Sequence, residues 1–412
     1  MAGGDCAAEP ELLTYEQALE RLLAAAQPVA DVETVPLRAA LGRVLAEPVA
    51  SAVDVPGWDY SAMDGYAVRA ADLDEAGGVL PVSQRIPAGT EPAPLLAGSA
   101  ARIFTGAPSP AGSDAVVIQE VCEARGDAVA LPQAPEPGAN IRRRGEDIRR
   151  GEQVLAAGLR LQPQHLGLAA SVGVGRLRVR RRLRVAVLAS GDELVMPGEP
   201  LRPGTIYNSN LFTATGLLQA LGCDVLDRGV VADRPTATRE AIAAAAAEAD
   251  LVLASGGVSV GEEDHVKPAV EALGRLDLWR LAIRPGKPLA FGWVGATPFI
   301  GTPGNPVSLF ATFVLFARPF ILARMGVADS LPQRLRAVAD FDWPTPDPRR
   351  EFHRARLQAG ADGCPRVRVH PSRSSGVLSS VAWANGLVVI PEGRVLRRGE
   401  AVDFLPFSEL LT

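Results

Sequence analysis

The residues best suited to chemistry lie in the stretch 250–264, which reads DLVLASGGVSVGEED. Four apolar residues predict a short buried strand, which runs into a Ser-Gly-Gly turn and then into three carboxylates that end at Asp264. Glycines at the end of a strand let backbone N–H groups approach an anion, and carboxylates suit a divalent cation. The stretch indicates a phosphate-bearing ligand with a metal beside it. A tight loop with a solvated acidic rim is the competing interpretation.

The same pattern recurs at residues 184–193, where an apolar strand again ends in Ser-Gly and two acids, the second being Glu193. A third predicted strand leads into a loop that carries Asp233. Because a doubly wound parallel sheet binds its ligand at the carboxyl ends of its strands, we expect Glu193, Asp233 and Asp264 to converge on one site.

Two further turns offer positive charge and free backbone N–H groups. Arg284 and Lys287 stand in a Pro/Gly turn between two predicted strands, and the turn 301–306 leads into a long apolar helix. Pro306 near that helix start leaves N–H groups free to receive phosphate or a molybdate-like anion. The sequence has neither a P-loop nor a dinucleotide-binding fingerprint, which argues against a P-loop nucleotidase and a dinucleotide fold.

A second group of candidates precedes the sheet. Asp64 stands in a turn-rich segment directly before Gly-Tyr, and we interpret it as a functional carboxylate, whereas Asp54 suits Asx-turn chemistry. Thr105 lies at the end of a predicted strand, where a plain hairpin explains most of the pattern. Arg142 opens a run of three arginines that is followed by acids up to Asp147. This run is equally compatible with a solvated face and with an oxyanion site.

These residues must be positioned by several domains. Alternating strands and helices over residues 183–328 predict a doubly wound parallel sheet, and short apolar runs over residues 79–135 predict a small all-β module. From about residue 330, short alternating strands predict a small β-barrel or sandwich, whose basic and apolar content indicates packing rather than a site. Within it, residues 372–386 predict a helix with serines at its start. Residues 11–26 predict an amphipathic helix capped by Thr14.

Composition narrows the function classes. The 412-residue chain has a net charge of -5 and a pI near 5.6, so nothing global attracts it to nucleic acid or anionic membranes. Its four scattered cysteines fit a reducing cytoplasm, the four histidines lack zinc-type spacing, and no secretory signal is expected at the N-terminus. The apolar run 307–316 is far short of the ~20 residues of a membrane span, which predicts a buried helix.

Seven segments, taken together, resemble a known family. SAMDGYAVR, IFTGAPSPAGSDAVV, NIRRRGEDI, SGDELV, SGGVSVGEEDH, RPGKPLAFG and GTPGNPVS are similar to the signature segments of the molybdopterin molybdenumtransferases, in the family's order. The resemblance covers residues 15 to 410 and implies a multidomain α/β plus β fold. The implied domains are an elongated linking or dimerisation domain (1–54 and 143–182), an inserted β domain (55–142), a doubly wound molybdopterin-binding domain (183–328) and a C-terminal β-barrel (329–412).

The resemblance also implies a reaction. Adenylylated molybdopterin binds near Mg²⁺, molybdate enters beside it, and the metal passes to the dithiolene as AMP leaves. Such chemistry needs charge neutralisation rather than a covalent nucleophile. The implied partners are these substrates and a second copy of the chain in a homodimer, together with transfer contacts to molybdopterin adenylyltransferase and molybdoenzyme chaperones. No nucleic acid or membrane partner is expected, and the implied location is cytoplasmic.

Family resemblance assigns roles to particular residues. It implies catalytic roles for Asp64, Thr105, Asp147, Glu193, Asp233 and Asp264, with Glu193 and Asp264 as ligands of Mg²⁺. The implied substrate-binding residues are Arg142, Ser190, Gly191, Gly256, Gly257, Arg280, Arg284, Lys287, Pro303, Gly304, Pro306 and Ser375. Arg280 and Arg284 stand where other members often have lysine, which keeps the charge but changes its geometry.

Two alternative functions remain. One is the enzyme that adenylylates molybdopterin, which has a similar doubly wound domain but lacks the flanking β domains that this chain carries. The other is a non-catalytic molybdopterin-binding scaffold, against which the retained carboxylates argue.

Overall fold

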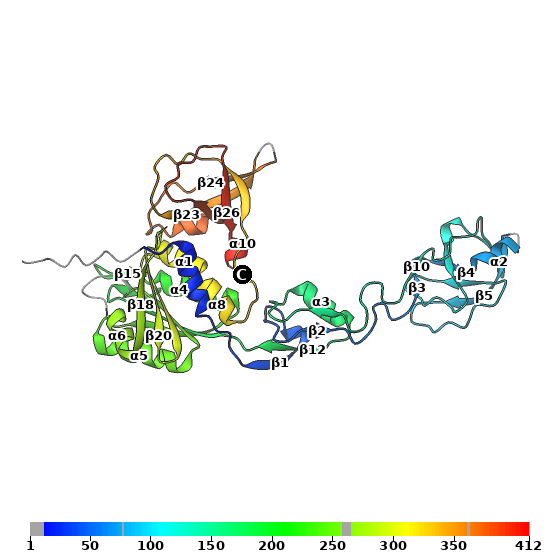
Figure 1. Cartoon of the computed structure of the whole chain (residues 1–412), viewed down its shortest axis with the longest axis horizontal. Coiled ribbons are helices and arrows are strands. Elements are labelled where there is room, and N and C mark those ends of the chain that lie inside the picture. Colours follow the sequence, from blue (N-terminus) through cyan, green and yellow to red (C-terminus); the bar gives the residue numbers. More distant parts are fainter. Residues whose placement is uncertain (1–11, 76–77, 258–264, 361–362, 412) are drawn as a thin grey trace, which may run out of the picture.

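The computed structural model describes residues 12–75, 78–257, 265–360 and 363–411. The protein is elongated (Figure 1). A small β domain lies at one end, a slender linking region follows, and the other end holds an α/β domain with a β-barrel above it.

The α/β domain is built on a six-stranded sheet in the order β16-β13-β17-β21-β20-β18. Its parallel strands are β16 (Asp224–Val231), β13 (Arg184–Ser190), β17 (Leu251–Ser255) and β21 (Thr297–Thr302). The strands β20 (Pro288–Val294) and β18 (Gly274–Arg280) extend it through antiparallel pairs. This mixed edge forms because β20 and β21 are joined by a tight hairpin, which can only connect antiparallel strands.

Helices cover both faces of this sheet, so the prediction of a doubly wound domain is confirmed. Along β13, Val185 and Val187 pack into one core with α4 (Ser209–Leu221), and the alternate residues Ala186 and Leu188 pack into another with α5 (Pro235–Glu248). α7 (Pro306–Thr312) and α8 (Arg318–Arg324), joined by the π-helical turn Phe313–Ala317, belong to the first core, whereas α6 (Val266–Leu273) belongs to the second.

The helical stretch Pro306–Arg324 is long and apolar enough to cross a membrane by composition, but 89% of it is buried inside the protein. It forms the core helix that the sequence predicts. α1 (Tyr15–Ala24) packs against it through an edge contact of Tyr15 with Phe316, at 5.4 Å between ring centroids. Thr14 and Gln17 form the predicted capping box at the start of α1. The resemblance places α1 in the linking domain, and its apolar face packs into the core of the α/β domain; the domain boundaries stay predictions.

The linking region consists of two short ribbons and a helix. β1 (Val32–Pro36) pairs with β12 (Arg176–Arg180), and β2 (Val49–Ala50) pairs with β11 (Gln153–Leu155). The helix α3 (Pro163–Ser171) and the 3-10 turn Leu37–Ala39 pack on them. A third ribbon, β3 (Tyr60–Ser61) with β10 (Ile141–Arg142), leads into the distal domain.

The inserted β domain, called the distal domain below, is a six-stranded sheet in the order β7-β4-β6-β5-β9-β8. Its strands are β4 (Gly65–Val68), β5 (Val79–Ile86), β6 (Ala100–Ile103), β7 (Ala115–Ile118), β8 (Glu123–Arg125) and β9 (Ala128–Ala130). The 3-10 turn Gln119–Val121 follows β7, and the helix α2 (Ala70–Glu75) follows β4. α2 precedes the segment 79–135 that the sequence predicts as an all-β module, and within that segment the structure has strands and the single 3-10 turn.

The C-terminal domain is a closed barrel, because β23 (Arg350–Ala359) pairs with both β24 (Pro365–Val369) and β25 (Gly386–Ile390). β22 (Leu335–Ala339) and β26 (Ala401–Pro406) complete the ring, and β19 (Ile283–Arg284) of the α/β domain adds to the edge of β23. The short helices are α9 (Ser379–Trp383) and α10 (Phe407–Leu410).

One expected helix is shorter than predicted. The sequence predicts a helix over residues 372–386, but only Ser379–Trp383 is helical. Before it, the hydroxyl of Ser372 accepts a hydrogen bond from the backbone N–H of Ser374, and the hydroxyl of Ser374 accepts one from Gly376, both at 3.2 Å. Serine hydroxyls that bond nearby N–H groups compete with helix formation, which explains the difference.

Candidate functional site

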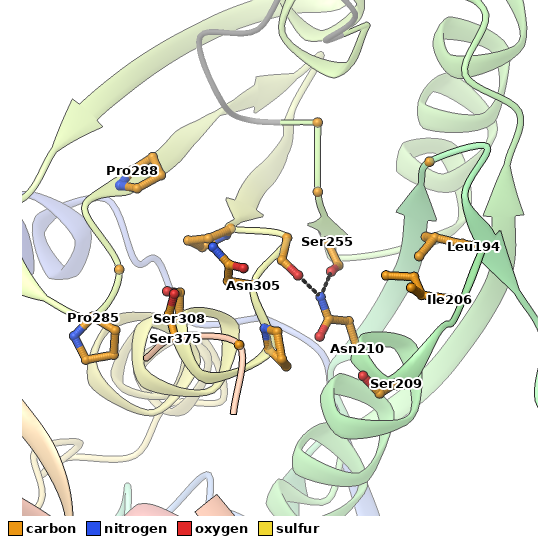
Figure 2. A pocket seen from close by; sticks show the side chains of 18 of the residues that line it. Leu194, Ile206, Ser209, Asn210, Ser255, Pro285, Pro288, Asn305, Ser308 and Ser375 are labelled. Carbon is orange, nitrogen blue, oxygen red and sulfur yellow. Dashed lines mark hydrogen bonds between the residues drawn. The ribbon is translucent and has the colours of Figure 1, made fainter. Parts of the chain in front are cut away.

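A large open pocket of about 1230 Å³ lies at the carboxyl ends of the parallel strands (Figure 2). Its walls come from the loops after β13, β17 and β21, from the start of α4 and from the turn between β19 and β20. A loop of the C-terminal barrel, residues 373–376, closes one side. The backbone N–H of Val307 at the start of α7 donates to the carbonyl of Ser375 at 3.0 Å, which attaches this barrel loop to the α/β domain.

The loop after β13 carries the acidic side of the pocket. The hydroxyl of Ser190 lies 3.3 Å from Oδ1 of Asp233, and the backbone N–H of Asp233 donates to Asp192 at 3.1 Å. Gly191 has a φ of 150°, and a Cβ there would lie 2.6 Å from Oε2 of Glu193. Only glycine therefore lets the Glu193 carboxylate fold back against the loop.

The loops after β17 and β21 are held together by Asn210 of α4 (Figure 2). Its Nδ2 donates to the Ser255 hydroxyl at 3.0 Å and to the Gly304 carbonyl at 2.7 Å. Gly256 has a φ of 83°, and a Cβ there would lie 2.9 Å from the carbonyl oxygen of Ser190. The backbones of the two Ser-Gly turns therefore approach as closely as glycine allows.

The basic side of the pocket is arranged by carboxylates of the barrel. Asp347 accepts from Arg284 at 3.0 Å and from two nitrogens of the Arg349 guanidinium, each also at 3.0 Å. These bonds, above all those from the Arg349 side chain, hold the pKa of the Asp347 carboxyl well below its usual range. Arg373 pairs with the buried carboxylate of Glu351 at 2.6 Å. The pocket therefore presents cations whose positions are fixed before a ligand arrives.

A separate pair of candidates lies in the distal domain. Oδ1 of Asp64 accepts hydrogen bonds from both the backbone N–H and the hydroxyl of Thr105, each at 2.8 Å. The backbone N–H, followed by the hydroxyl, lowers the pKa of the Asp64 carboxyl. Within one chain, this pair lies at the opposite end of the molecule from the pocket (Figure 1).

Comparison with known proteins identifies the architecture. The chain matches the MoeA N-terminal region (domain I and II) over residues 13–173, a probable molybdopterin binding domain over residues 186–323, and the MoeA C-terminal region (domain IV) over residues 336–407. A molybdopterin molybdenumtransferase of Haemophilus influenzae is 37% identical, with 97% of this chain and 100% of that protein covered. The chain belongs to the molybdopterin molybdenumtransferase family.

Further relatives agree with this family assignment. A molybdopterin molybdenumtransferase of a Nostoc species is 39% identical over 88% of this chain and 86% of that protein. The crystal structure of a molybdopterin biosynthesis MoeA protein from Pyrococcus horikoshii superimposes with a TM-score of 0.83 at 32% identity, over 96% of this chain and 100% of that one. The resemblance inferred from the sequence motifs and the predicted fold class are both confirmed.

The structure brings together most of the residues to which the family resemblance assigned roles, although their roles stay predictions. Those that line the pocket are Ser190, Gly191, Glu193, Asp233, Gly256, Gly257, Arg284, Lys287, Pro303, Gly304, Pro306 and Ser375. Arg280, at the end of β18, is not among the residues that line it. Asp264 lies outside the described residues.

The remaining predicted residues lie away from the pocket of their own chain. Asp64 and Thr105 belong to the distal domain, and Arg142 belongs to the ribbon at its base. Arg142 pairs with Glu146 at 3.3 Å, and Asp147 is exposed. Both interpretations of the arginine run that begins at Arg142, an oxyanion site and a solvated face, therefore remain possible.

The donor set of the pocket fits Mg²⁺ in one of its usual binding modes. Mg²⁺ is commonly held by one or two carboxylates together with substrate phosphates, while it keeps several waters. Glu193 and Asp233 supply two carboxylates in one pocket. The described residues contain no group of three or more His, Cys, Asp and Glu side chains that would form a metal site from protein alone.

Sequence reasoning missed several residues of the pocket. Asn208 and Asn210 line the pocket but are not among the predicted site residues, and Asn208 also caps α4 by accepting from the backbone N–H of Leu211 at 3.1 Å. Arg349 and Arg373 lie in the domain that the sequence assigned to packing, and that interpretation is wrong for these two. Two clusters in the sequence could have indicated these arginines, Asp-Pro-Arg-Arg and Ser-Arg-Ser-Ser. Their polar residues interrupt the alternating pattern of the predicted strands.

Proposed function

We propose that this protein inserts molybdenum into adenylylated molybdopterin, using molybdate, and releases AMP in a Mg²⁺-dependent reaction that forms the molybdenum cofactor. Family membership supports a role in molybdenum-cofactor synthesis. The observation that carries the finer proposal is the pocket itself, in which Glu193 and Asp233 share one cavity with Arg284, Lys287, Arg349 and Arg373. Carboxylates and cations around one cavity are the donors that a phosphoanhydride and an oxyanion require.

The residues of the chain have distinct parts in this proposal. The Arg284 and Arg349 guanidiniums, fixed by Asp347, bind and orient the anionic groups of the substrate and molybdate. At the start of α7, Pro306 has no N–H and the N–H of Val307 donates to Ser375, so in this proposal the anion is bound by side chains.

Glu193 and Asp264 are the Mg²⁺ ligands that the family resemblance implies, and Asp233 offers a further carboxylate in the same pocket as Glu193. Bound there, Mg²⁺ would neutralise the charge that develops on the phosphoanhydride oxygens as AMP leaves.

The proposal includes a homodimer. In one chain, Asp64 and Thr105 lie too far from the pocket to act in it (Figure 1). We propose that the distal domain of one protomer lies at the pocket of the other, so that each of two equivalent sites combines residues of both protomers. The cytoplasm as the location, and transfer contacts with the adenylyltransferase and with molybdoenzyme chaperones, belong to the same proposal.

The test is AMP release from adenylylated molybdopterin with molybdate and Mg²⁺, measured with purified protein. We expect Asp64→Ala and Glu193→Ala each to abolish turnover while the protein stays folded. When the two variants are unfolded together and refolded as a mixture, half of the dimers combine one chain of each kind. Each such dimer has one intact site, so about a quarter of wild-type activity should return.

Asp403→Ala is the matched control, because Asp403 also pairs with two arginines, Arg334 and Arg336, on the barrel but away from the pocket. It should release AMP at the wild-type rate. No AMP from the wild-type protein would favour a non-catalytic molybdopterin-binding scaffold. Activity of the single variants equal to wild type would overturn the site assignment, and mixtures that stay inactive would overturn the shared site.

A further inference from the structure

Two arginines face each other on one side of the distal sheet. Arg102 of β6 is opposite Arg85 of β5 in a parallel pair, and opposite Tyr66 of β4 in an antiparallel pair. Side chains opposite each other on neighbouring strands lie on the same face of the sheet. Like charges in this arrangement repel, so the pair opposes the stability of the sheet that carries it.

Neither arginine forms a salt bridge within the described part of the chain, although the charge of Arg102 acts on the Asp64 carboxylate and helps to lower its pKa after the two hydrogen bonds from Thr105. Both guanidiniums instead lie over the ring of Phe104, Arg102 at 4.6 Å and Arg85 at 4.9 Å from its centroid. Arg102 also lies 5.2 Å from the Tyr66 ring centroid. A ring holds a guanidinium by its face and leaves its positive charge in place.

Other arginines of the same domain are paired conventionally. Arg69 bonds Asp72, and Arg125 bonds Glu123 at 2.7 Å. The pair without a salt bridge is therefore a local departure rather than a property of the domain. Departures of this kind, which cost stability without a gain in the free protein, are expected at functional sites.

The two arginines lie next to the predicted catalytic residues of the distal domain, Asp64 and Thr105. Thr105 follows Phe104 directly, and Arg102 donates to the carbonyl of Gly65, the residue after Asp64, at 3.0 Å. Oδ1 of Asp64 is engaged by Thr105. One surface of the distal domain thus combines two cations, an aromatic ring and a carboxylate within a few residues of each other.

We propose that Arg85 and Arg102 bind the phosphate of an adenylate, the AMP part of the substrate, while the pocket of the other protomer holds the pterin. This inference rests on the proposed function, because it needs a nucleotide-bearing substrate that spans two protomers. Arg85 is held by the face of its guanidinium, so its in-plane N–H groups can match phosphate oxygens in paired geometry, whereas Arg102 already donates to the Gly65 carbonyl and to Oε1 of Gln119 and adds chiefly its positive charge. Arg85 is exposed and forms no hydrogen bond or ion pair with the described residues, so its donors are available.

The experiment measures AMP binding to the full-length protein by calorimetry, with adenosine and inorganic phosphate as partial ligands. Arg85→Ala is the main variant, since Arg85 is exposed and its replacement leaves the strand intact. Arg125→Ala, another exposed arginine of the same domain, is the matched control. We expect Arg85→Ala to weaken AMP binding about tenfold, the usual loss of one charge-assisted contact, and Arg125→Ala to leave it unchanged.

A second measurement locates the nucleotide. Crosslinking with 8-azido-AMP, followed by peptide mapping, should label the segments around residues 85 and 102–105. Unchanged AMP affinity in Arg85→Ala, an equal loss of adenosine affinity, or labels confined to the central pocket would each overturn the proposal. These results are distinct from failure of the proposed function, which shows as absent AMP release from adenylylated molybdopterin by the wild-type protein.

Discussion

The central pocket and the distal arginine pair are both positively charged, but they hold that charge in different ways. In the pocket, Arg284 and Arg349 share the carboxylate of Asp347, and Arg373 pairs with Glu351. In the distal domain, Arg85 and Arg102 stack on an aromatic ring instead. Carboxylate pairing fixes the position of a cation and offsets part of its field, whereas stacking fixes position and leaves the field for a ligand.

The two regions also rest on cores of different size. The pocket loops extend from a sheet that is covered on both faces, with a large core on the side of α1, α4, α7 and α8. The distal sheet rests on two small clusters of its own, one of them around Leu80, Val68 and Val129. None of these residues belongs to the core of the α/β domain, so we expect the two regions to unfold independently.

Leu80→Ala tests this independence and carries the largest expected effect. Leu80 is fully buried in the distal core, so we expect a loss of roughly 2–5 kcal/mol from the unfolding free energy of that domain alone. Hydrogen exchange read by mass spectrometry should show faster exchange in β4, β5 and β6 with β13 and β17 unchanged. Leu253→Ala in β17 is the counterpart, which should speed exchange in β13 and β17 and leave β4, β5 and β6 unchanged. Faster exchange in both domains from either variant would show that the two domains do not unfold independently.

Asp347→Asn tests whether the pocket needs its arginines fixed in advance. The variant keeps the shape of the side chain but removes the charge that Arg284 and Arg349 share. Loss of such a supporting partner typically costs 10–100-fold in ligand affinity, so the KM for adenylylated molybdopterin should rise by roughly that factor. Asp403→Asn, with arginine partners elsewhere on the barrel, should leave KM unaltered. Equal KM values for the wild type, Asp347→Asn and Asp403→Asn would show that the pairing of Asp347 with the two arginines is not needed for substrate binding.

The wild type and Asp347→Asn also differ in how their stability should depend on pH. The pKa of Asp347 is held well below its usual range, first by the Arg349 side chain. A carboxyl whose pKa is lowered by folding stabilises the native state above its unfolded pKa of about 3.9 and loses that contribution as pH falls toward the folded pKa. The wild-type advantage over Asp347→Asn in urea unfolding should therefore be largest near neutral pH and shrink below about pH 4. An advantage that grows on acidification would contradict the charge-based account.

Thr105→Val gives the smallest expected effect, on the distal side. The substitution removes the hydroxyl that donates to Asp64 but keeps the backbone N–H that donates to the same oxygen. Because the N–H is the larger cause of the lowered pKa, only part of the shift should disappear, and the Asp64 pKa should rise toward its usual value. Carbon-detected NMR titration can measure this, with Asp54 as an internal reference whose Arg150 and Arg144 donors are untouched. An unmoved Asp64 titration would mean that the hydroxyl is dispensable.

The fold could be predicted largely because its strongest patterns are local. The capped helix at Thr14, the Ser-Gly turns after β13 and β17, and the buried helix from Pro306 are each specified by residues that are neighbours in sequence. The convergence of Glu193 and Asp233 also followed from local signals, since carboxyl ends of parallel strands share an edge. The antiparallel arrangement of β20 follows from the tight turn that joins it to β21, a local signal that the prediction of a wholly parallel sheet did not use.

The parts of the site that were missed depend on contacts between distant segments. Arg349 reaches the pocket because Asp347 bonds Arg284, 63 residues earlier in the chain. The Ser-Arg-Ser-Ser loop reaches it because α7 bonds Ser375. Arg102 and Arg85 are separated by a long connection and meet only through strand pairing. Pairings at such separations leave no periodicity in the sequence, so spacing alone could not have predicted them.

The ribbon formed by β3 and β10 has a consequence for how this protein can change over evolution. The chain enters the distal domain at Tyr60–Ser61 and leaves it at Ile141–Arg142, and these two segments are hydrogen-bonded to each other. An antiparallel pair can be closed by a tight turn of two residues, so everything between them forms a portable module. Its removal or exchange would leave the register of the linking ribbons unchanged. A lineage could thus discard or replace the distal domain, with the residues that we propose it contributes to a partner protomer, while it keeps the central pocket.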